Sequence, residues 1–262
     1  MFEKYLNNRF IVLYFFPFIL GALTTLSFEP FNLTIINLVI FPIFFYLVIY
    51  INKKSRSVYR KKPYKKNLFI YGLLFGFGFY ICGISWITNS LTFDENFKVL
   101  IPFALILIPL FLSLFLALTI LFVGPYLKFN FPSLFLFSAS IATCDYLRAK
   151  VLTGFPWNLW AYSTTWISEL LQVTNLIGLF SYNLLTVFVF TVPAIFFFKI
   201  SIIKKVTISF LLVFFVFSLY VFGNYEINKN KKVLDTTTEK IFVKIVSPSF
   251  DLEYGLDEKD IE

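Results

Sequence analysis

The feature that most constrains this chain is a series of long apolar segments separated by short polar loops. A helix that crosses a bilayer needs about 20 mostly apolar residues. The segments that meet this requirement are residues 10–27, 32–51, 68–90, 99–123, 132–150, 168–198 and 206–223. Hydrophobic residues make up 58% of the 262 residues and charged residues 15%, against about 45–50% and 25% in soluble domains. We therefore predict an all-α polytopic membrane protein with about seven transmembrane helices, and exclude a soluble enzyme or a disordered chain.

Two of these segments need closer interpretation. Residues 168–198 could form one tilted helix, or a surface segment that leads into a span, and Pro193 predicts a break or kink near their end. The first segment follows Lys4 and Arg9, as the apolar part of a signal peptide would. No small-residue cleavage site follows it, so we expect a retained helix.

Loop charges predict the orientation of the spans. If the N-terminus is cytoplasmic, the inner segments carry fourteen Lys and Arg residues and the outer segments carry two. The inner segments are then 1–9, 52–67, 124–131 and 199–205, and the outer segments are 27–31, 91–98 and 150–167. This is a strong positive-inside bias, and it accounts for a net charge of +8 without a nucleic-acid partner.

The last part of the chain differs in composition from the spans. Residues 1–223 form the predicted transmembrane domain, and residues 224–239 read as a polar linker. Residues 240–246 are rich in β-branched side chains, which predicts a strand. A lone strand has nothing to pair with, so we expect the chain to stop just after a soluble domain begins at residue 240.

The residue inventory limits the chemistry. The chain has no His, which excludes a Ser-His-Asp triad, a Cys-His pair and any imidazole metal site. Two isolated cysteines, Cys82 and Cys144, make neither a zinc site nor a disulfide framework. Both lie in apolar runs, where cysteine is usually inert. We expect no metal or organic cofactor.

An aromatic segment follows the fifth span. Gly154 and Pro156 predict a turn, and Trp157 and Asn158 follow directly. Tryptophan at this position suits the membrane–water boundary, so the segment is either an ordinary aromatic belt or a platform for a lipid.

Three charged residues are candidates for a role on the same side of the membrane. Asp145 and Arg148 stand three residues apart and would share a helix face, either as a structural ion pair or as part of a site. Glu29 lies in a short outer loop and could be merely solvated.

A different signal comes from Gly72 and Gly76, whose GxxxG spacing predicts close helix packing.

These residues together resemble the apolipoprotein N-acyltransferase family of bacterial inner membranes. The most specific match is residues 145–148 followed by residues 153–158. Further matches are residues 21–31, 76–79, 83–87, Gln172 with 178–183, and 243–246. The family resemblance covers nearly the whole chain.

The resemblance implies an acyltransferase of lipoprotein maturation. A fatty acyl group passes from a phospholipid to an enzyme cysteine, and then to the α-amino group of the diacylglyceryl-cysteine of an apolipoprotein. The implied partners are a phospholipid donor, an apolipoprotein acceptor and membrane lipid. The resemblance also implies a multi-pass inner-membrane protein whose periplasmic tail enters an α/β nitrilase-like domain at the predicted strand. That domain supplies a Glu base, a Lys and the Cys nucleophile.

No residue of this chain matches that Glu, Lys or Cys. We therefore expect a truncated membrane half that is inactive alone, with Trp157, Asn158, Arg148 and Glu29 forming a lipid-binding floor. A second hypothesis is a non-catalytic membrane module that binds lipid or lipoprotein, including one that works with a separate nitrilase-like subunit. A transporter is disfavoured, since the spans show few charges and no evident repeat.

Overall fold

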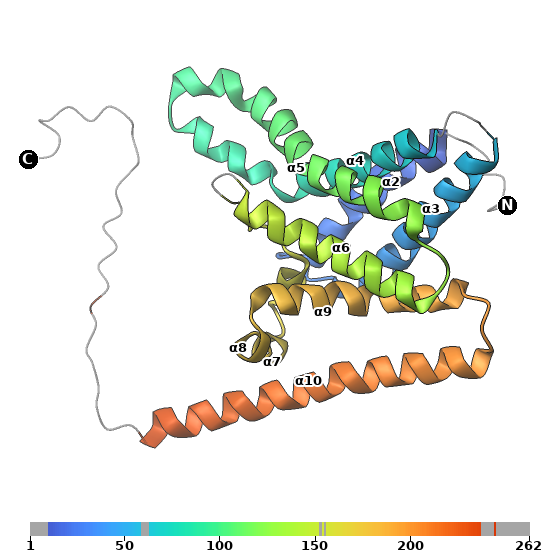
Figure 1. Ribbon diagram of the computed structural model, residues 1–262. Coiled ribbons are helices and arrows are strands. Elements are labelled where there is room, and N and C mark those ends of the chain that lie inside the picture. The colour runs from blue at the N-terminus through green and yellow to red at the C-terminus, as the bar shows by residue number, and fades with distance from the viewer. Residues whose placement is uncertain (1–9, 59–62, 152–153, 155, 237–243, 245–262) are drawn as a thin grey trace, which may run out of the picture.

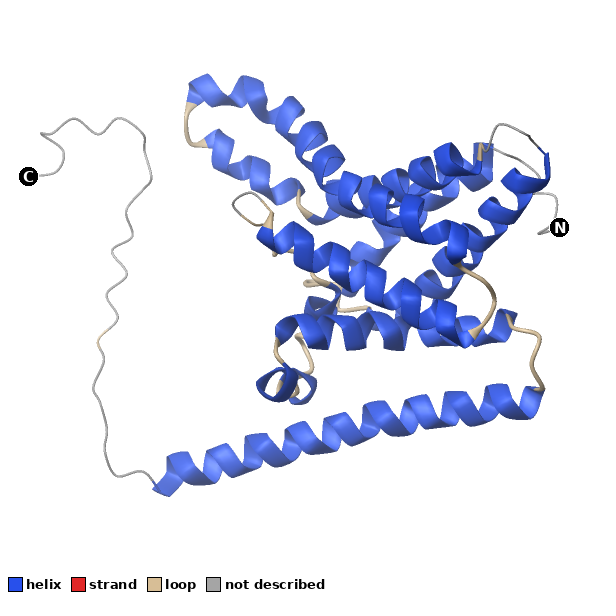
Figure 2. Ribbon diagram, in the orientation of Figure 1, coloured by secondary structure: helices blue, strands red, loops and turns tan. Residues whose placement is uncertain are grey.

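The computed structural model describes residues 10–58, 63–151, 154, 156–236 and 244. Within these residues every regular element is a helix (Figure 2). The α-helices are α2 (Phe16–Thr24), α3 (Asn37–Val58), α4 (Tyr64–Gly83), α5 (Ile101–Val123), α6 (Phe131–Lys150), α7 (Ser168–Leu171), α8 (Thr174–Ile177), α9 (Leu179–Thr191) and α10 (Ile202–Thr236). A π-helical turn η1 (Ile11–Phe15) precedes them, and the 3-10 segments are η2 (Thr25–Ser27), η3 (Thr34–Ile36), η4 (Ser85–Thr92), η5 (Glu95–Leu100), η6 (Gly124–Tyr126), η7 (Trp160–Thr164) and η8 (Val192–Phe197).

The all-α character is confirmed for the described residues, and their helices are consistent with the predicted membrane protein. Five helical segments of the described chain are long and apolar enough to cross a bilayer: Thr34–Arg56, Tyr64–Gly83, Glu95–Tyr126, Leu179–Phe197 and Ile202–Leu234. The first predicted span is a shorter apolar helix, Ile11–Ser27, and the fifth coincides with α6. The number of seven spans stays a prediction.

The long apolar segment 168–198 is not one tilted helix. Two single-turn helices, α7 and α8, come first, and α9 begins only after Gly178, whose φ of 77° interrupts the helix. Glycine adopts a positive φ without the penalty that a Cβ imposes. Pro193 lies where α9 changes to the 3-10 segment η8, as the predicted break required.

The seventh span is longer than its apolar sequence. α10 continues as a helix through the polar residues up to Thr236, so the segment that we interpret as a linker is helical that far. Most of α10 is exposed, with residues such as Phe210 and Val213 facing away from the bundle. Of the strand predicted at 240–246, all residues except Lys244 lie outside the described part of the chain.

The helices run back and forth between two ends that differ in chemistry (Figure 1). At the basic end, on the right of Figure 1, Arg56 and Asn52 of α3 donate hydrogen bonds to the Pro125 carbonyl. Lys53 lies over the ring of Phe129 at the same end. We call the opposite end, formed by residues 28–34, 83–87 and 154–166, the aromatic end.

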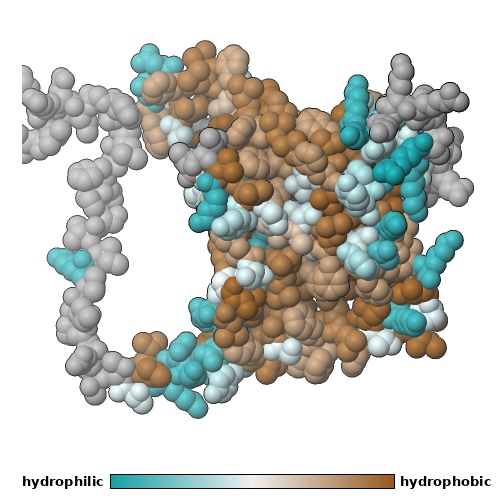
Figure 3. All heavy atoms as spheres, viewed as in Figure 1, coloured by the Kyte–Doolittle hydropathy of each residue, from teal (hydrophilic) through white to brown (hydrophobic). Residues whose placement is uncertain are grey.

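Charge follows this division. The described parts of the predicted inner segments lie at the basic end, and those of the predicted outer segments 27–31, 91–98 and 150–167 lie toward the other (Figure 1). Figure 3 shows that apolar residues cover most of the middle of the visible face, while hydrophilic residues gather mainly toward its ends. This is the distribution expected of a protein whose middle faces hydrocarbon.

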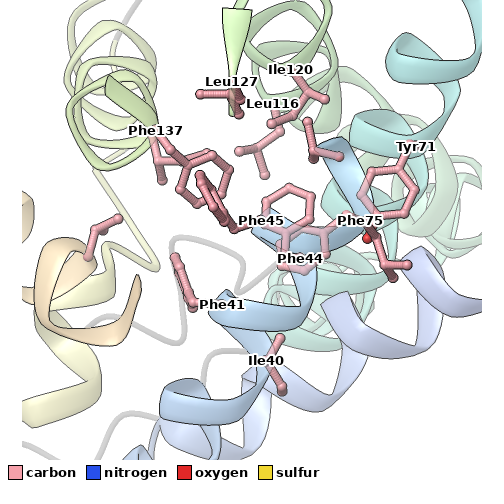
Figure 4. Packing of buried hydrophobic residues seen from close by; sticks show 14 of the residues in the cluster. Ile40, Phe41, Phe44, Phe45, Tyr71, Phe75, Leu116, Ile120, Leu127 and Phe137 are labelled. Carbon is pink, nitrogen blue, oxygen red and sulfur yellow. The ribbon is translucent and has the colours of Figure 1, made fainter. Parts of the chain in front are cut away.

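The core lies between α3, α4, α5 and α6 (Figure 4). Phe44 of α3 stacks on Phe75 of α4 with ring centroids 3.9 Å apart, and meets Phe137 of α6 edge-on at 5.4 Å. Leu116 and Ile120 of α5 close the same cluster. Interlocked rings of this kind give contact area and fixed geometry, which makes these four helices a rigid frame for the aromatic end.

Glycines let α4 approach its neighbours closely. A Cβ on Gly72 would lie 2.9 Å from the Leu116 carbonyl oxygen of α5, and one on Gly76 would lie 2.8 Å from the Ser113 Cβ. The close packing predicted from the GxxxG spacing is therefore confirmed, and the partner is α5. Small residues at such crossings replace the hydrophobic driving force that helices lack in lipid.

A second crossing, between α2 and α4, is closer still. A Cβ on Gly21 would lie 2.0 Å from the Phe75 carbonyl oxygen, and one on Gly78 would lie 2.1 Å from the Phe18 carbonyl oxygen. The two helices can touch at this point because neither carries a side chain there.

We expect Gly21→Ala and Gly78→Ala each to lower the midpoint of thermal unfolding in detergent by about 5 °C or more, since overpacking costs about 1–3 kcal/mol. Alanine ordinarily stabilises a helix relative to glycine by about 0.8–1.0 kcal/mol. A fall in the midpoint therefore indicates overpacking at the crossing. Ala139→Leu, on an exposed position of α6, is the control that adds volume without a crossing. Alanine variants as stable as the parent would show that α2 and α4 do not touch at these glycines.

Candidate functional site

The site is built around an ion pair that is buried in an otherwise apolar bundle. Asp145 and Arg148 lie near the C-terminal end of α6, three residues apart on one helix face. The Arg148 Nη2 donates to Asp145 Oδ1 at 3.2 Å, and Arg148 and Asp145 are 1% and 2% exposed. Tyr80 of α4 covers the guanidinium, with its ring centroid 5.4 Å from Cζ. Charges this deep are stable only when they are paired and hydrogen-bonded.

Asn183 of α9 completes the pair. Its Nδ2 donates to Asp145 Oδ2 at 2.8 Å, and its Oδ1 accepts from the Ala161 N–H at 2.9 Å. Both carboxylate oxygens of Asp145 therefore have a donor, one from α6 and one from α9. The same asparagine also fixes the first residues of η7 against α9.

The guanidinium reaches the turn that carries the predicted aromatic residues. Arg148 Nη1 donates to the Trp157 carbonyl oxygen at 2.7 Å. Gly154, with a φ of 79°, allows the chain to turn back after α6, because a Cβ there would lie 2.4 Å from the Ala149 carbonyl oxygen. Burial raises the pKa of Tyr162 nearby, and the charge of Arg148 partly opposes that rise.

A further contact fixes this turn to α4. Asn158 has a φ of 55°, and its Nδ2 lies 3.3 Å from the Gly83 carbonyl oxygen at the end of α4. A Cβ on Gly83 would lie 2.4 Å from that nitrogen, so only glycine leaves room for the contact. The turn that contains Trp157 and Asn158 is thus held from α6 and from α4.

Two exposed tryptophans lie together at this fixed turn, one of them in the turn and the other in η4. The rings of Trp86 in η4 and Trp157 are 5.1 Å apart, and about half of each side chain is exposed, 47% and 51%. We call these two residues the tryptophan pair. Large aromatic surfaces on a rigid base are the groups that most often carry binding energy.

The turn at residues 28–31 lies beside this region without joining the ion-pair network. Phe28 packs on Phe79 and Trp160, with ring centroids 5.8 and 6.3 Å apart. Thr34 donates to the Ser163 carbonyl and accepts from Trp166 Nε1. Glu29 is exposed, and within the described chain it has neither a hydrogen bond nor an ion-pair partner.

The structure thus brings together three of the four candidate site residues. Arg148, Trp157 and Asn158 belong to one connected network, whereas Glu29 lies on a neighbouring turn. Arg148 is buried, so it contacts the turn and not the surroundings. Asn183 and Tyr80 are not among the site residues that the sequence predicts. Asn183 could have been predicted from the sequence, because it is a polar residue inside the apolar run 179–191.

The described residues offer little catalytic chemistry of their own. No group of three or more acidic or cysteine side chains in them lies close enough to hold a metal ion. Cys144 is buried, and Cys82 is exposed on α4 with no charged partner in the described chain. What the arrangement can do is present a rigid aromatic surface at one end of a membrane bundle.

Fold and site define a polytopic helical membrane protein with a braced aromatic end. A family model described as the apolipoprotein N-acyltransferase N-terminal domain matches residues 20–192. The chain belongs to the apolipoprotein N-acyltransferase family. The match ends at the first residue of η8, so it covers both the Gly21 crossing and the polar network from Tyr80 to Asn183.

Curated relatives agree. The chain is 31% identical over 183 residues to an apolipoprotein N-acyltransferase of Brucella melitensis, which covers 68% of this chain and 33% of the relative. The corresponding protein of Rhodopseudomonas palustris is 32% identical over 176 residues, 67% of this chain and 32% of the relative. That of Bradyrhizobium diazoefficiens is 33% identical over 175 residues, 66% and 32% respectively. The chain spans about a third of the length of the curated relatives it matches.

The ion pair leads to a stability prediction. Arg148→Met leaves the Asp145 carboxylate buried without its cation, which costs about 3–5 kcal/mol. We expect the thermal midpoint in detergent to fall by about 10 °C or more. The double variant Asp145→Leu with Arg148→Met removes both charges and should recover most of the loss. A single Arg148→Met variant as stable as the parent would show that the pair is not buried.

Proposed function

We propose that this chain is the membrane half of an enzyme that N-acylates the N-terminal S-diacylglyceryl-cysteine of apolipoproteins, with a phospholipid as acyl donor. The observation that carries the proposal is the family match over residues 20–192, which contains both the apolar bundle and its braced aromatic end. The membrane half holds the donor lipid, and a nitrilase-like domain that begins near residue 240 supplies the catalytic Glu, Lys and Cys. The 262-residue chain alone is then inactive.

The aromatic end has the properties that this role requires. The acyl chains of a donor phospholipid lie at the depth of the bundle, and the ester to be attacked lies at its outer boundary. Exposed tryptophans with a fixed base suit that boundary, because the ring packs on hydrocarbon while the N–H reaches polar groups. Trp157 and Asn158 would touch lipid, Arg148 would hold their turn, and exposed Glu29 would line its edge.

The basic end supports the matching orientation. Lysines and arginines of the α3–α4 connection, the 124–131 loop and the 199–205 loop would face the cytoplasm, and the aromatic end would face the periplasm. The protein would lie in the bacterial inner membrane with its C-terminal segment outside. Anionic lipid would then favour the basic end as an anchor.

The test uses the complete gene product in cells that are depleted of their own apolipoprotein N-acyltransferase. Trp157→Ala should lower the N-acylation rate about five- to thirtyfold, since removing an aromatic anchor costs about 1–2 kcal/mol. Trp166→Ala is the matched control, because Trp166 is also half exposed at the aromatic end but hydrogen-bonds Thr34 and lies outside the turn. Equal losses from both variants would contradict a lipid role for the turn.

The catalytic assignment has its own test. Cys82→Ser and Cys144→Ser in the complete gene product should leave N-acylation within about twofold of the parent, because neither thiol forms the thioester in the proposed enzyme. The 262-residue chain expressed alone should give no N-acylation. Activity of that chain that either substitution abolishes would overturn the proposal.

The second candidate is a non-catalytic membrane module with a separate nitrilase-like subunit. The matched residues 20–192 lie within the helical bundle, which fits a membrane module as well as a membrane half. Purification of the tagged chain from its native membrane decides between the two. A soluble nitrilase-like protein in constant ratio with the chain would favour the module, and one covalent product carrying both parts would favour the single enzyme.

A further inference from the structure

The residue that links α6 and η7 is Asn183 of α9. It is fully buried in α9, 38 residues from Asp145 along the chain, and each end of its amide makes one hydrogen bond to a different element. The amide nitrogen holds Asp145 on α6, and the amide oxygen holds the Ala161 N–H on η7. A single side chain therefore fixes α6 and η7 relative to α9.

Three hydrogen bonds connect Asn183 to the tryptophan pair. Asn183 holds one carboxylate oxygen of Asp145, and the other oxygen holds Arg148. Arg148 in turn holds the Trp157 carbonyl at 2.7 Å. Each link starts from a buried side chain, where an unmade bond costs the desolvation of the group left behind. Each contact in this series is therefore costly to break.

We propose that Asn183 is a positioning residue of the aromatic end: through Asp145 and Arg148 it sets where Trp157 lies against Trp86. The inference deepens the proposed function, because it names a residue that would place the lipid-facing pair without touching lipid. The placement itself is a property of the chain and holds whatever the pair binds.

Two substitutions break the link in different ways. Asn183→Leu keeps the branched shape and the number of heavy atoms but removes both hydrogen bonds. Asp145→Asn keeps the shape of the carboxylate but turns an N–H₂ group toward the Asn183 amide nitrogen, so two donors face each other. Adding Asn183→Asp to that variant restores the match. The carboxylate introduced on α9 can accept both from the new amide on α6 and from the Ala161 N–H.

A matched control lies on the same helix. Thr191 is equally buried in α9, and its hydroxyl donates to the Val187 carbonyl of its own helix at 2.7 Å. Thr191→Val therefore removes a buried hydrogen bond of α9 without touching α6 or η7. It shows what general loosening of the helix does.

The experiment is ¹⁹F NMR of the full chain in lipid nanodiscs, with 5-fluorotryptophan at its four tryptophans. Single Trp→Phe variants assign the signals. Asn183→Leu and Asp145→Asn should shift or broaden the signals of Trp157 and Trp86, and the Asp145→Asn, Asn183→Asp double variant should return them to the parent positions. Thr191→Val should leave both signals in place.

Three results would overturn the inference: unchanged Trp157 and Trp86 signals in Asn183→Leu, no return in the double variant, or an equal shift in Thr191→Val. If Asn183→Leu does not fold, the comparison of Asp145→Asn with the double variant still decides. Quenching of tryptophan fluorescence by phospholipid brominated on its acyl chains then separates this inference from the proposed function. Restored signals without quenching of the pair would keep the positioning role and remove the lipid role.

Discussion

The aromatic end depends on one physical constraint, which is that Asp145 and Arg148 are charged groups with almost no access to water. An unpaired ion in an apolar bundle is costly, so the pair recruits partners from other elements. Asn183 comes from α9, Tyr80 from α4, and the Trp157 carbonyl from the turn after α6. The requirement to satisfy two charges thereby fixes the relative position of three helices and a turn.

The second constraint is the absence of a hydrophobic driving force between helices in lipid. The bundle meets it by close approach, with Gly21 and Gly78 at the α2–α4 crossing and Gly72 and Gly76 at the α4–α5 crossing. Stacked rings such as Phe44 and Phe75 then fill the remaining space. The frame is rigid where the site needs it, while α10 stays mostly exposed along its length.

These two constraints explain why Trp157 is held in place by more contacts than a position at the membrane boundary requires. A belt tryptophan needs only the boundary, whereas Trp157 follows a glycine turn, is held by Arg148 and sits beside an asparagine fixed to Gly83. The reaction of the proposed enzyme requires the membrane half to hold a lipid in position. A braced aromatic surface at one end of the bundle would be a physical means of providing it.

The sequence by itself determined the type of secondary structure and the local motifs of this protein. Apolar length dictates membrane helices, the i, i+3 spacing brings Asp145 and Arg148 to one face, the GxxxG spacing predicts a close crossing, and the residues around Trp157 indicate the family. These are properties of short stretches of chain, and they can be read without knowing which other helices pack against them.

What only the tertiary structure decided is which partners meet: Asn183 with Asp145, Asn158 with Gly83, and Gly21 with α4. Such contacts join residues tens of positions apart, and the cost of burying a polar group states that a partner must exist without saying where in the chain it lies.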